Sequence, residues 1–321
     1  MRRLLLILVA IAVVTGGMSA TASFRQGLKN GLDALRMGSY DEAARVFDRV
    51  AMDGVSNART VAESRLLRGS AKLRLGDVQQ AKLDFATALQ TGHDGNRAWA
   101  LSEQCWIHWR EGRAAAAVAA AAEAIALRPN LANAYKCRGY VMKQAGRYPQ
   151  ALRDYNRLLA LPRLPERARA RALAQRGDVH YRRGDFRAAG RDFSLGLRLQ
   201  PGDAGLLTAR CRARAFGGLA AAAIEDCRQA LAHDPEHPVA RDSLGLAYLF
   251  AGSARPALAA FESLIETRPD AWYAHFHRAL ALEELGRATE AAEARAAARR
   301  LAPSARAYDK KERKFRAREA V

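Results

Sequence analysis

The residue types best able to hold a metal ion or attack a substrate are four cysteines and seven histidines. A zinc site needs several such ligands at short, regular spacings, because all of them must reach one ion. The cysteines stand far apart, and His233 and His237 flank Pro235 without a third ligand nearby. No phosphate-binding loop, nucleophile elbow or pair of carboxylates stands out either. The sequence therefore predicts no enzyme activity, no metal and no cofactor.

The cysteines have two other possible uses. Cys105, Cys211 and Cys227 occupy packing positions of the periodic pattern described below, which favours small buried thiols. In an oxidising compartment Cys211 and Cys227 could instead form a disulfide, if helix packing brings their Cα atoms within about 7 Å.

Three of the four tryptophans lie close together in the chain. Trp99, Trp106 and Trp109 are spaced so that one α-helix would place them on a single face. Tryptophan often anchors protein interfaces, because it buries a large area and offers one polar group. The three rings could bind a partner, fill a gap inside the fold or form a dimer contact.

A regular spacing of small residues shows which elements position these side chains. Eight times a Gly is followed five positions later by an Ala, and the pairs recur at nearly constant intervals along the chain. The pairs are Gly38/Ala43, Gly76/Ala81, Gly112/Ala117, Gly146/Ala151, Gly184/Ala189, Gly218/Ala223, Gly252/Ala257 and Gly286/Ala291. Such a period is typical of a solenoid, in which each unit buries its apolar face against its neighbours. The Gly would end the first helix of each unit in a left-handed cap.

Other positions repeat relative to each Ala. Five repeats have a Gly twelve positions before it and an aromatic residue four positions after it, and Pro often follows at the twelfth position beyond it. The Gly and aromatic pairs are Gly31/Phe47, Gly69/Phe85, Gly139/Tyr155, Gly177/Phe193 and Gly245/Phe261. The Pro would end the second helix, with Asn130, Asp203 and Ser304 as natural caps for the next one.

Over residues 24–303 this pattern resembles the tetratricopeptide repeat, a helix–turn–helix unit of about 34 residues. The resemblance implies an all-α, right-handed superhelical solenoid of about eight repeats. Residues 304–321 would add a basic C-terminal capping helix or tail.

The resemblance also implies a binding surface. Proteins with these repeats generally hold a peptide or a partner helix on a concave face lined by the first helices. Counting back from each Ala places eight partner-binding candidates there: Trp99, Trp106, Trp109, Asn133, Lys136, Tyr140, Lys143 and Tyr181. The two lysines could pair with a carboxylate of the guest. Internal packing remains the alternative for the tryptophans, since the third repeat has Ala121 where most repeats have an aromatic residue.

Four repeats share a pair of opposite charges. An Arg thirteen positions before the Ala accompanies an Asp three positions after it: Arg68/Asp84, Arg138/Asp154, Arg176/Asp192 and Arg210/Asp226. We expect an ion pair between the two helices of one repeat, partly buried, which makes these eight residues architectural.

Residues 1–22 are typical of a secretory signal. Arg2 and Arg3 precede an apolar run from Leu4 to Val14, and a small-residue cleavage motif ends at Ala22. We expect cleavage before Ser23 and a periplasmic protein. An uncleaved membrane anchor at residues 4–22 is the alternative, and a cytosolic protein with an apolar start is a third.

The formal net charge of +19 attracts anionic partners and repels basic ones. Nucleic acid is disfavoured if the chain is exported, whereas anionic lipid, wall polymers and acidic proteins fit that compartment. Unpaired positive charge gathers at Arg163–Arg171 and in the tail at 310–318. The tail could contact an anionic surface or lipid, or simply cap the solenoid with its charges in water.

Together these features predict a non-enzymatic scaffold of the bacterial cell envelope that binds a protein or peptide partner in its concave groove. The alternative is a structural protein, or an accessory enzyme subunit, docked electrostatically on an anionic envelope surface.

Overall fold

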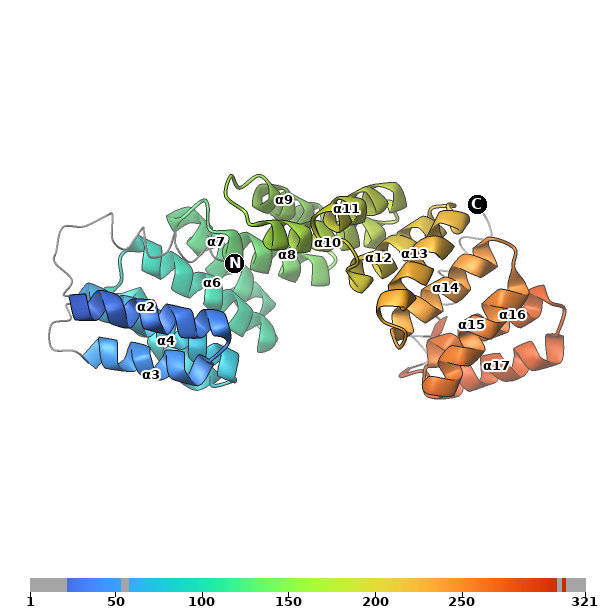
Figure 1. The fold of residues 1–321 in the computed structure, drawn as a ribbon, viewed down its shortest axis with the longest axis horizontal. Coiled ribbons are helices and arrows are strands. Elements are labelled where there is room, and N and C mark those ends of the chain that lie inside the picture. Colours follow the sequence, from blue (N-terminus) through green and yellow to red (C-terminus); the bar gives the residue numbers. More distant parts are fainter. Residues whose placement is uncertain (1–21, 53–57, 305–307, 310–321) are drawn as a thin grey trace. The chain divides into compact units, whose positions relative to one another are not determined.

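The computed structural model describes residues 22–52, 58–304, 308 and 309. Every regular element in that part of the chain is an α-helix, so the all-α prediction is confirmed (Figure 1). The helices are α2 (Ala22–Met37), α3 (Tyr40–Met52), α4 (Ala58–Leu75), α5 (Val78–Thr91), α6 (Asp94–Arg110), α7 (Ala114–Leu127), α8 (Ala132–Gln144), α9 (Tyr148–Leu159), α10 (Glu166–Arg183), α11 (Phe186–Leu199), α12 (Ala204–Phe216), α13 (Ala220–His233), α14 (Pro238–Phe250), α15 (Ala254–Thr267), α16 (Trp272–Glu284) and α17 (Ala288–Leu301).

Each predicted repeat is one pair of consecutive helices, from α2/α3 to α16/α17. All eight turn glycines adopt a positive φ between 70° and 88°, which a residue with a Cβ rarely adopts. In the third repeat the Gly112 amide donates to the Trp109 carbonyl at 3.0 Å, and the next amide donates to the His108 carbonyl at 2.9 Å. The glycine thus closes the first helix as expected, and the second helix begins at once.

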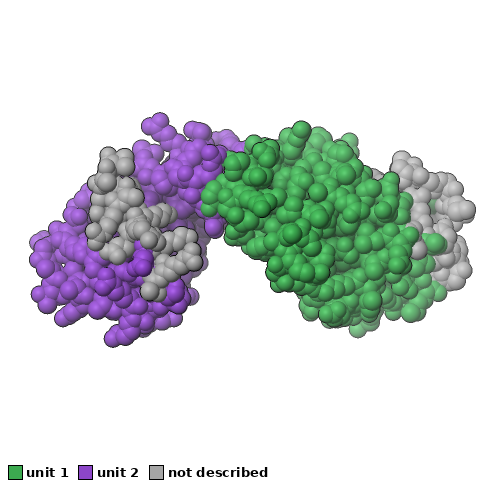
Figure 2. Space-filling model, turned by 180° about the vertical axis from the view of Figure 1, so that it is seen from behind, with its two compact units in different colours: residues 1–175 green, residues 176–321 purple. Residues whose placement is uncertain are grey.

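The chain divides into two compact units, residues 1–175 and 176–321, shown in green and purple in Figure 2. The boundary falls within α10. In the first unit the first helices of neighbouring repeats contact each other, α4 with α6 and α6 with α8. In the second unit α12 contacts α14, and α14 contacts α16. Each unit therefore buries its apolar residues between successive helix pairs. The first helices of its repeats lie next to one another and form one surface.

Close contact inside each pair depends on the Gly and aromatic positions. The five aromatic side chains are at most 3% exposed. A Cβ at Gly177 would lie 2.6 Å from the Phe193 ring, and one at Gly69 would lie 2.8 Å from the Phe85 ring. The glycine therefore leaves the space that the ring fills, which confirms the predicted contact between the two helices.

The four predicted Arg–Asp pairs all form. The guanidinium of Arg138 contacts Asp154 through both Nε and Nη2, with the shorter contact at 2.7 Å. The Arg176–Asp192 and Arg210–Asp226 contacts are also 2.7 Å, and the Arg68–Asp84 contact is 2.5 Å. All four Asp residues are at most 4% exposed. Two parallel charged hydrogen bonds fix the helices of one repeat in register.

The predicted caps are only partly correct. Asp203 caps α12, because its carboxylate accepts from the Leu206 amide at 2.9 Å. Asn130 is not a cap: α8 begins after Leu131, which has no side-chain cap bond and packs into the core at 6% exposure. Burial of that leucine shifts the helix start by one residue. Past Ser304 the chain is described only at residues 308 and 309.

The expectation of buried free thiols is wrong. Cys211 and Cys227 form a disulfide, with Cα atoms 5.5 Å apart, between the helices of the sixth repeat. They replace the Gly and the aromatic residue found at the same two positions in other repeats. Cys105 forms a second disulfide with Cys137, which lies in the next repeat. Two first helices, α6 and α8, are thereby joined covalently.

The two ends of the chain fall largely outside the described residues. This holds for the predicted signal or anchor at 1–22, except Ala22 at the start of α2, and for the basic tail at 310–318. Tyr308 is described: it is 1% exposed and packs edge-on against Phe276 with ring centroids 5.5 Å apart. No helix in the described part is long and apolar enough to cross a membrane.

Replacing Asp154 by Ala leaves the Arg138 guanidinium without its carboxylate in a partly buried position. We expect Asp154→Ala to lower the free energy of unfolding by about 3 kcal/mol, and the double variant with Arg138→Ala to lose less, since no unpaired charge remains. Denaturant titration followed by circular dichroism measures both. Glu123→Ala, which removes an exposed carboxylate of α7, is the control. A loss in Asp154→Ala no larger than in the control contradicts the pairing.

The disulfide of the sixth repeat should contribute to stability by closing a loop. Its cysteines are 16 residues apart, so the variant with both changed to Ala should lose about 3 kcal/mol of its free energy of unfolding.

The unreduced protein, unfolded in guanidinium, should show no thiol that reacts with Ellman's reagent. Reaction of thiols without prior reduction would contradict the two disulfides.

Candidate functional site

Three aromatic side chains from the first helices of the third and fourth repeats gather on one face. Trp106 of α6 lies against Tyr140 of α8 with ring centroids 5.5 Å apart. Trp109, one turn further along α6, meets the same tyrosine edge-on at 5.8 Å. All three side chains are partly exposed. We call Trp106, Trp109 and Tyr140 the aromatic face.

The two lysines predicted to bind a guest take different positions. Lys136 is an exposed residue whose ammonium lies 5.2 Å from the centre of the Trp106 ring. Lys143 is 4% exposed, lies 5.2 Å from the Tyr140 ring and donates to Gln175 Oε1 at 2.8 Å. Lys136 can therefore reach a guest at the surface, whereas Lys143 is buried and packs on the Tyr140 ring.

Asn133 positions the central tryptophan. Its Oδ1 accepts from Trp106 Nε1 at 3.2 Å, and its Nδ2 donates to Ser102 Oγ and Glu103 Oε1, both at 3.1 Å. Both amide hydrogens are thus directed at neighbours on α6. Asn133 lies in the predicted site, but its contacts orient Trp106 before any guest arrives, which reduces the ordering cost of binding.

Glu103 is a member of the site that the sequence did not single out. Burial raises the pKa of its carboxyl group, and the nearby charges of Lys136, Arg74 and Arg110 act in the opposite direction. Although Lys136 is exposed as a residue, its pKa is lowered, because neighbouring protein displaces part of the solvent around its ammonium, and Glu103 acts in the opposite direction. An acidic and a basic group therefore interact electrostatically near Trp106, with Glu103 held by Asn133 and Lys136 next to the Trp106 ring. The position of Glu103 four residues after Trp99 and three before Trp106, on the predicted helical face, was the available signal.

Trp99 is partly buried, as Trp106 and Trp109 are, but it packs against two buried clusters. The cluster containing Ala98 and Cys105 contacts all three tryptophans, and the cluster containing Leu66 and Phe85 contacts Trp99 as well. The Nε1 of Trp99 is buried without a hydrogen-bond partner. These contacts are those expected from internal packing, the alternative use of the tryptophans.

Tyr181 lies in the second unit, unlike the other seven candidates. It is 9% exposed and contacts Phe186 and Phe216 with ring centroids 5.5 and 5.8 Å away. The Arg212 guanidinium lies 4.9 Å from its ring. Tyr181 therefore belongs to an aromatic cluster of its own.

A buried pair of a histidine and a carboxylate lies within the second unit. His277 Nδ1 lies 2.6 Å from Asp242 Oδ1, joining α16 to α14, and the histidine is 0% exposed. No substrate can reach that ring in this packing. Among the described residues, no three His, Cys, Asp or Glu side chains gather where they could hold a metal ion.

A family model for the tetratricopeptide repeat matches residues 28–81, 139–204 and 243–306, which is more than half of the chain. The chain belongs to the tetratricopeptide repeat family. The matched segments contain six of the eight turn glycines and four of the five Gly–aromatic pairs described above, so the resemblance inferred from the sequence is confirmed. Tetratricopeptide repeats generally mediate protein interactions and do not carry catalytic groups of their own.

Solved structures agree on the fold. A repeat protein from Parabacteroides merdae is 18% identical, with a TM-score of 0.53 over 82% of this chain and 100% of that one. PilF of Pseudomonas aeruginosa is 15% identical, with a TM-score of 0.53 over 69% of this chain and 99% of that one. YrrB, described as having an unusual peptide-binding site, is 18% identical, with a TM-score of 0.50 over 59% and 95%. No curated protein sequence matches this chain significantly.

The different positions of Trp99 and Trp106 predict different effects of their removal. Trp99→Ala should lower the free energy of unfolding by about 3–5 kcal/mol, because it leaves a cavity between two buried clusters. Trp106→Ala should cost less than about 2 kcal/mol, since it loses one hydrogen bond and a partly exposed ring. Urea titration of both variants tests this. Equal losses would place Trp106 in the core.

Proposed function

We propose that this chain is a non-catalytic binding protein that holds a peptide or a segment of another protein against its aromatic face. The observation that carries the proposal is the geometry of Trp106. Its ring is partly exposed, packs at a tilt against the Tyr140 ring and donates a hydrogen bond to Asn133. Large rings held rigidly at a surface are the usual anchors of protein interfaces, because little conformational freedom is lost on binding.

The surroundings of these rings suit a polypeptide guest. Lys136 is an exposed residue beside the Trp106 ring and can meet a carboxylate of the guest. The face also lies on first helices, where members of this family generally bind. A peptide-binding site described for YrrB supports the same class of guest for this chain.

The proposal includes export to an oxidising compartment. Residues 1–22 have the features of a secretory signal, and both disulfides pair cysteines that are 0% exposed. Disulfides persist in secreted and periplasmic proteins and are rare where thiols are kept reduced. An envelope partner then fits both features better than a cytosolic one.

Crosslinking in intact cells tests the proposed function. A partner should be captured by the unaltered protein and lost from Trp106→Ala. The control is Trp272→Ala, which removes the remaining tryptophan, a partly buried residue of α16 in the second unit. Capture should persist between about 50 and 300 mM salt, because apolar contacts are not screened as exposed charges are.

Two outcomes would contradict the aromatic face as the binding site. Capture that is equal in the two tryptophan variants would exclude Trp106 as an anchor. Capture that disappears with rising salt but survives Trp106→Ala would favour the alternative, attachment of the basic chain to an anionic envelope surface.

A further inference from the structure

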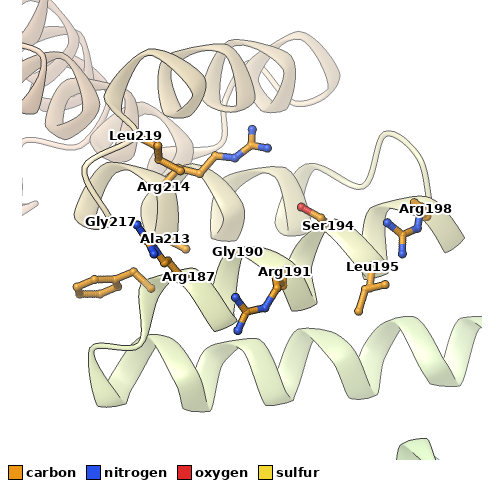
Figure 3. A pocket seen from close by; sticks show the side chains of 11 residues that line it. Arg187, Gly190, Arg191, Ser194, Leu195, Arg198, Ala213, Arg214, Gly217 and Leu219 are labelled. Atoms are coloured by element: carbon orange, nitrogen blue, oxygen red, sulfur yellow. The ribbon is translucent and has the colours of Figure 1, made fainter.

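The second unit contains a cleft of about 470 Å³ that the predicted site does not include (Figure 3). One side is α11, from Phe186 to Arg198, and the other side runs from Ala213 at the end of α12 to Leu219. The aromatic face belongs to first helices, whereas α11 is the second helix of the fifth repeat. The cleft is therefore a separate surface with its own chemistry.

The floor of the cleft is apolar. Leu195 lines it from α11, and Leu219 lines it from the opposite side and is 58% exposed. Phe186 closes one end, with its ring centroid 5.6 Å from that of Phe216. An exposed leucine beside partly buried rings offers area that a partner with apolar side chains could cover.

Gly190 lines the cleft and faces open space. Within the first helices, Gly177 and its counterparts face aromatic rings that a Cβ would strike. A Cβ at Gly190 would meet nothing within 4 Å. A glycine inside a helix is unfavourable compared with alanine, and packing gives no reason for this one. Its effect is to leave space along the wall of the cleft.

Three arginines of α11 border this space. Arg187, Arg191 and Arg198 are exposed, and none of them forms an ion pair with a carboxylate in the described part of the chain. Asp226, on the opposite side, is already held by Arg210 and Arg214, each at 2.7 Å. The border therefore keeps a positive charge that no neighbour neutralises.

The length of this border indicates an elongated ligand. Residues 187 and 198 are eleven positions apart, which is about 16 Å along a helix at 1.5 Å per residue. A single phosphate or carboxylate can meet one end of such a row but not both. The apolar floor between the charges suits a ligand that alternates apolar and acidic groups.

We propose that the cleft binds a segment of a partner protein that presents apolar side chains to Leu195 and Leu219 and several Asp or Glu side chains to the arginines. The apolar groups of the segment cover the floor, and its carboxylates form charged hydrogen bonds with the guanidinium groups. This site would give the chain a second ligand, chemically different from the one at the aromatic face.

The test uses the full chain and a fluorescein-labelled helical peptide of about 16 residues, with Leu on one face and Glu on both flanks. Fluorescence anisotropy should show binding that weakens more than about tenfold in Arg187→Glu/Arg191→Glu/Arg198→Glu, because three charged contacts are reversed. The control Arg255→Glu/Arg268→Glu/Arg300→Glu changes the charge of the second unit equally at exposed positions outside the cleft. It should bind nearly as well as the unaltered chain.

A second variant distinguishes binding in the cleft from attraction by charge alone. Gly190→Phe fills the cleft without changing the net charge, and the open space at this position allows the helix to form. It should abolish peptide binding, whereas Trp106→Ala should not affect it, and Lys in place of Glu in the peptide should prevent it.

Three results would overturn the proposal. Equal weakening in the two triple-arginine variants would indicate non-specific charge attraction. Unchanged binding in Gly190→Phe would place the peptide elsewhere. Binding of phosphatidylglycerol vesicles, but not of the peptide, would assign the cleft to a lipid surface instead of a protein segment.

Discussion

No helix pair of this chain can bury its apolar residues alone, so the whole fold depends on close packing within each pair and against the next one. Within a pair, the small residue on one helix sets how near the other can approach. The Phe193 ring occupies the place of the missing side chain of Gly177, and the Ala residues after the turns are at most 1% exposed. Because interiors are packed as densely as crystals, this contact leaves little choice of geometry.

Three repeats lack this contact, and in two of them, the third and the sixth, the cysteine at the glycine position forms a disulfide. The sixth repeat places Cys211 and Cys227 at the Gly and aromatic positions and joins them. The third repeat has Cys105 and Ala121 there, and its cysteine bonds to Cys137 of the fourth repeat. Those two cysteines neighbour Trp106 and Lys136 in sequence. The least regular repeat is thus crosslinked beside the aromatic face, where rigid placement of a ring favours binding.

The positively charged residues of the chain lie in at least two distinct environments. Part of the charge is internal, since four arginines are held by buried aspartates between the helices of their repeats. Part of it lies on the surface, as at Arg187 and Arg191 on α11, where no carboxylate within the described residues is paired with it. Net charge alone therefore overstates the charge that a partner can meet, and its position matters more than its total.

The sequence by itself determined the features that repeat within one helix pair. The period, the left-handed turn glycines, the Gly–aromatic contacts and the Arg–Asp pairs all join residues at constant separations of a few turns, so their pattern is visible in the chain. The contact partners within a helix pair were predictable because residues at the same separation in sequence lie at the same distance in every repeat.

Only the tertiary structure decided how neighbouring pairs meet. It packed Trp99 against a second buried cluster and Trp106 against Tyr140, although both belong to one predicted helical face. It paired Cys105 with Cys137, directed the Asn133 amide to Trp106 and opened the cleft along α11. These contacts occur once and join different repeats, so no periodicity marks them. They depend on how the side chains of successive pairs fill the shared space, which is settled only when the pairs pack together.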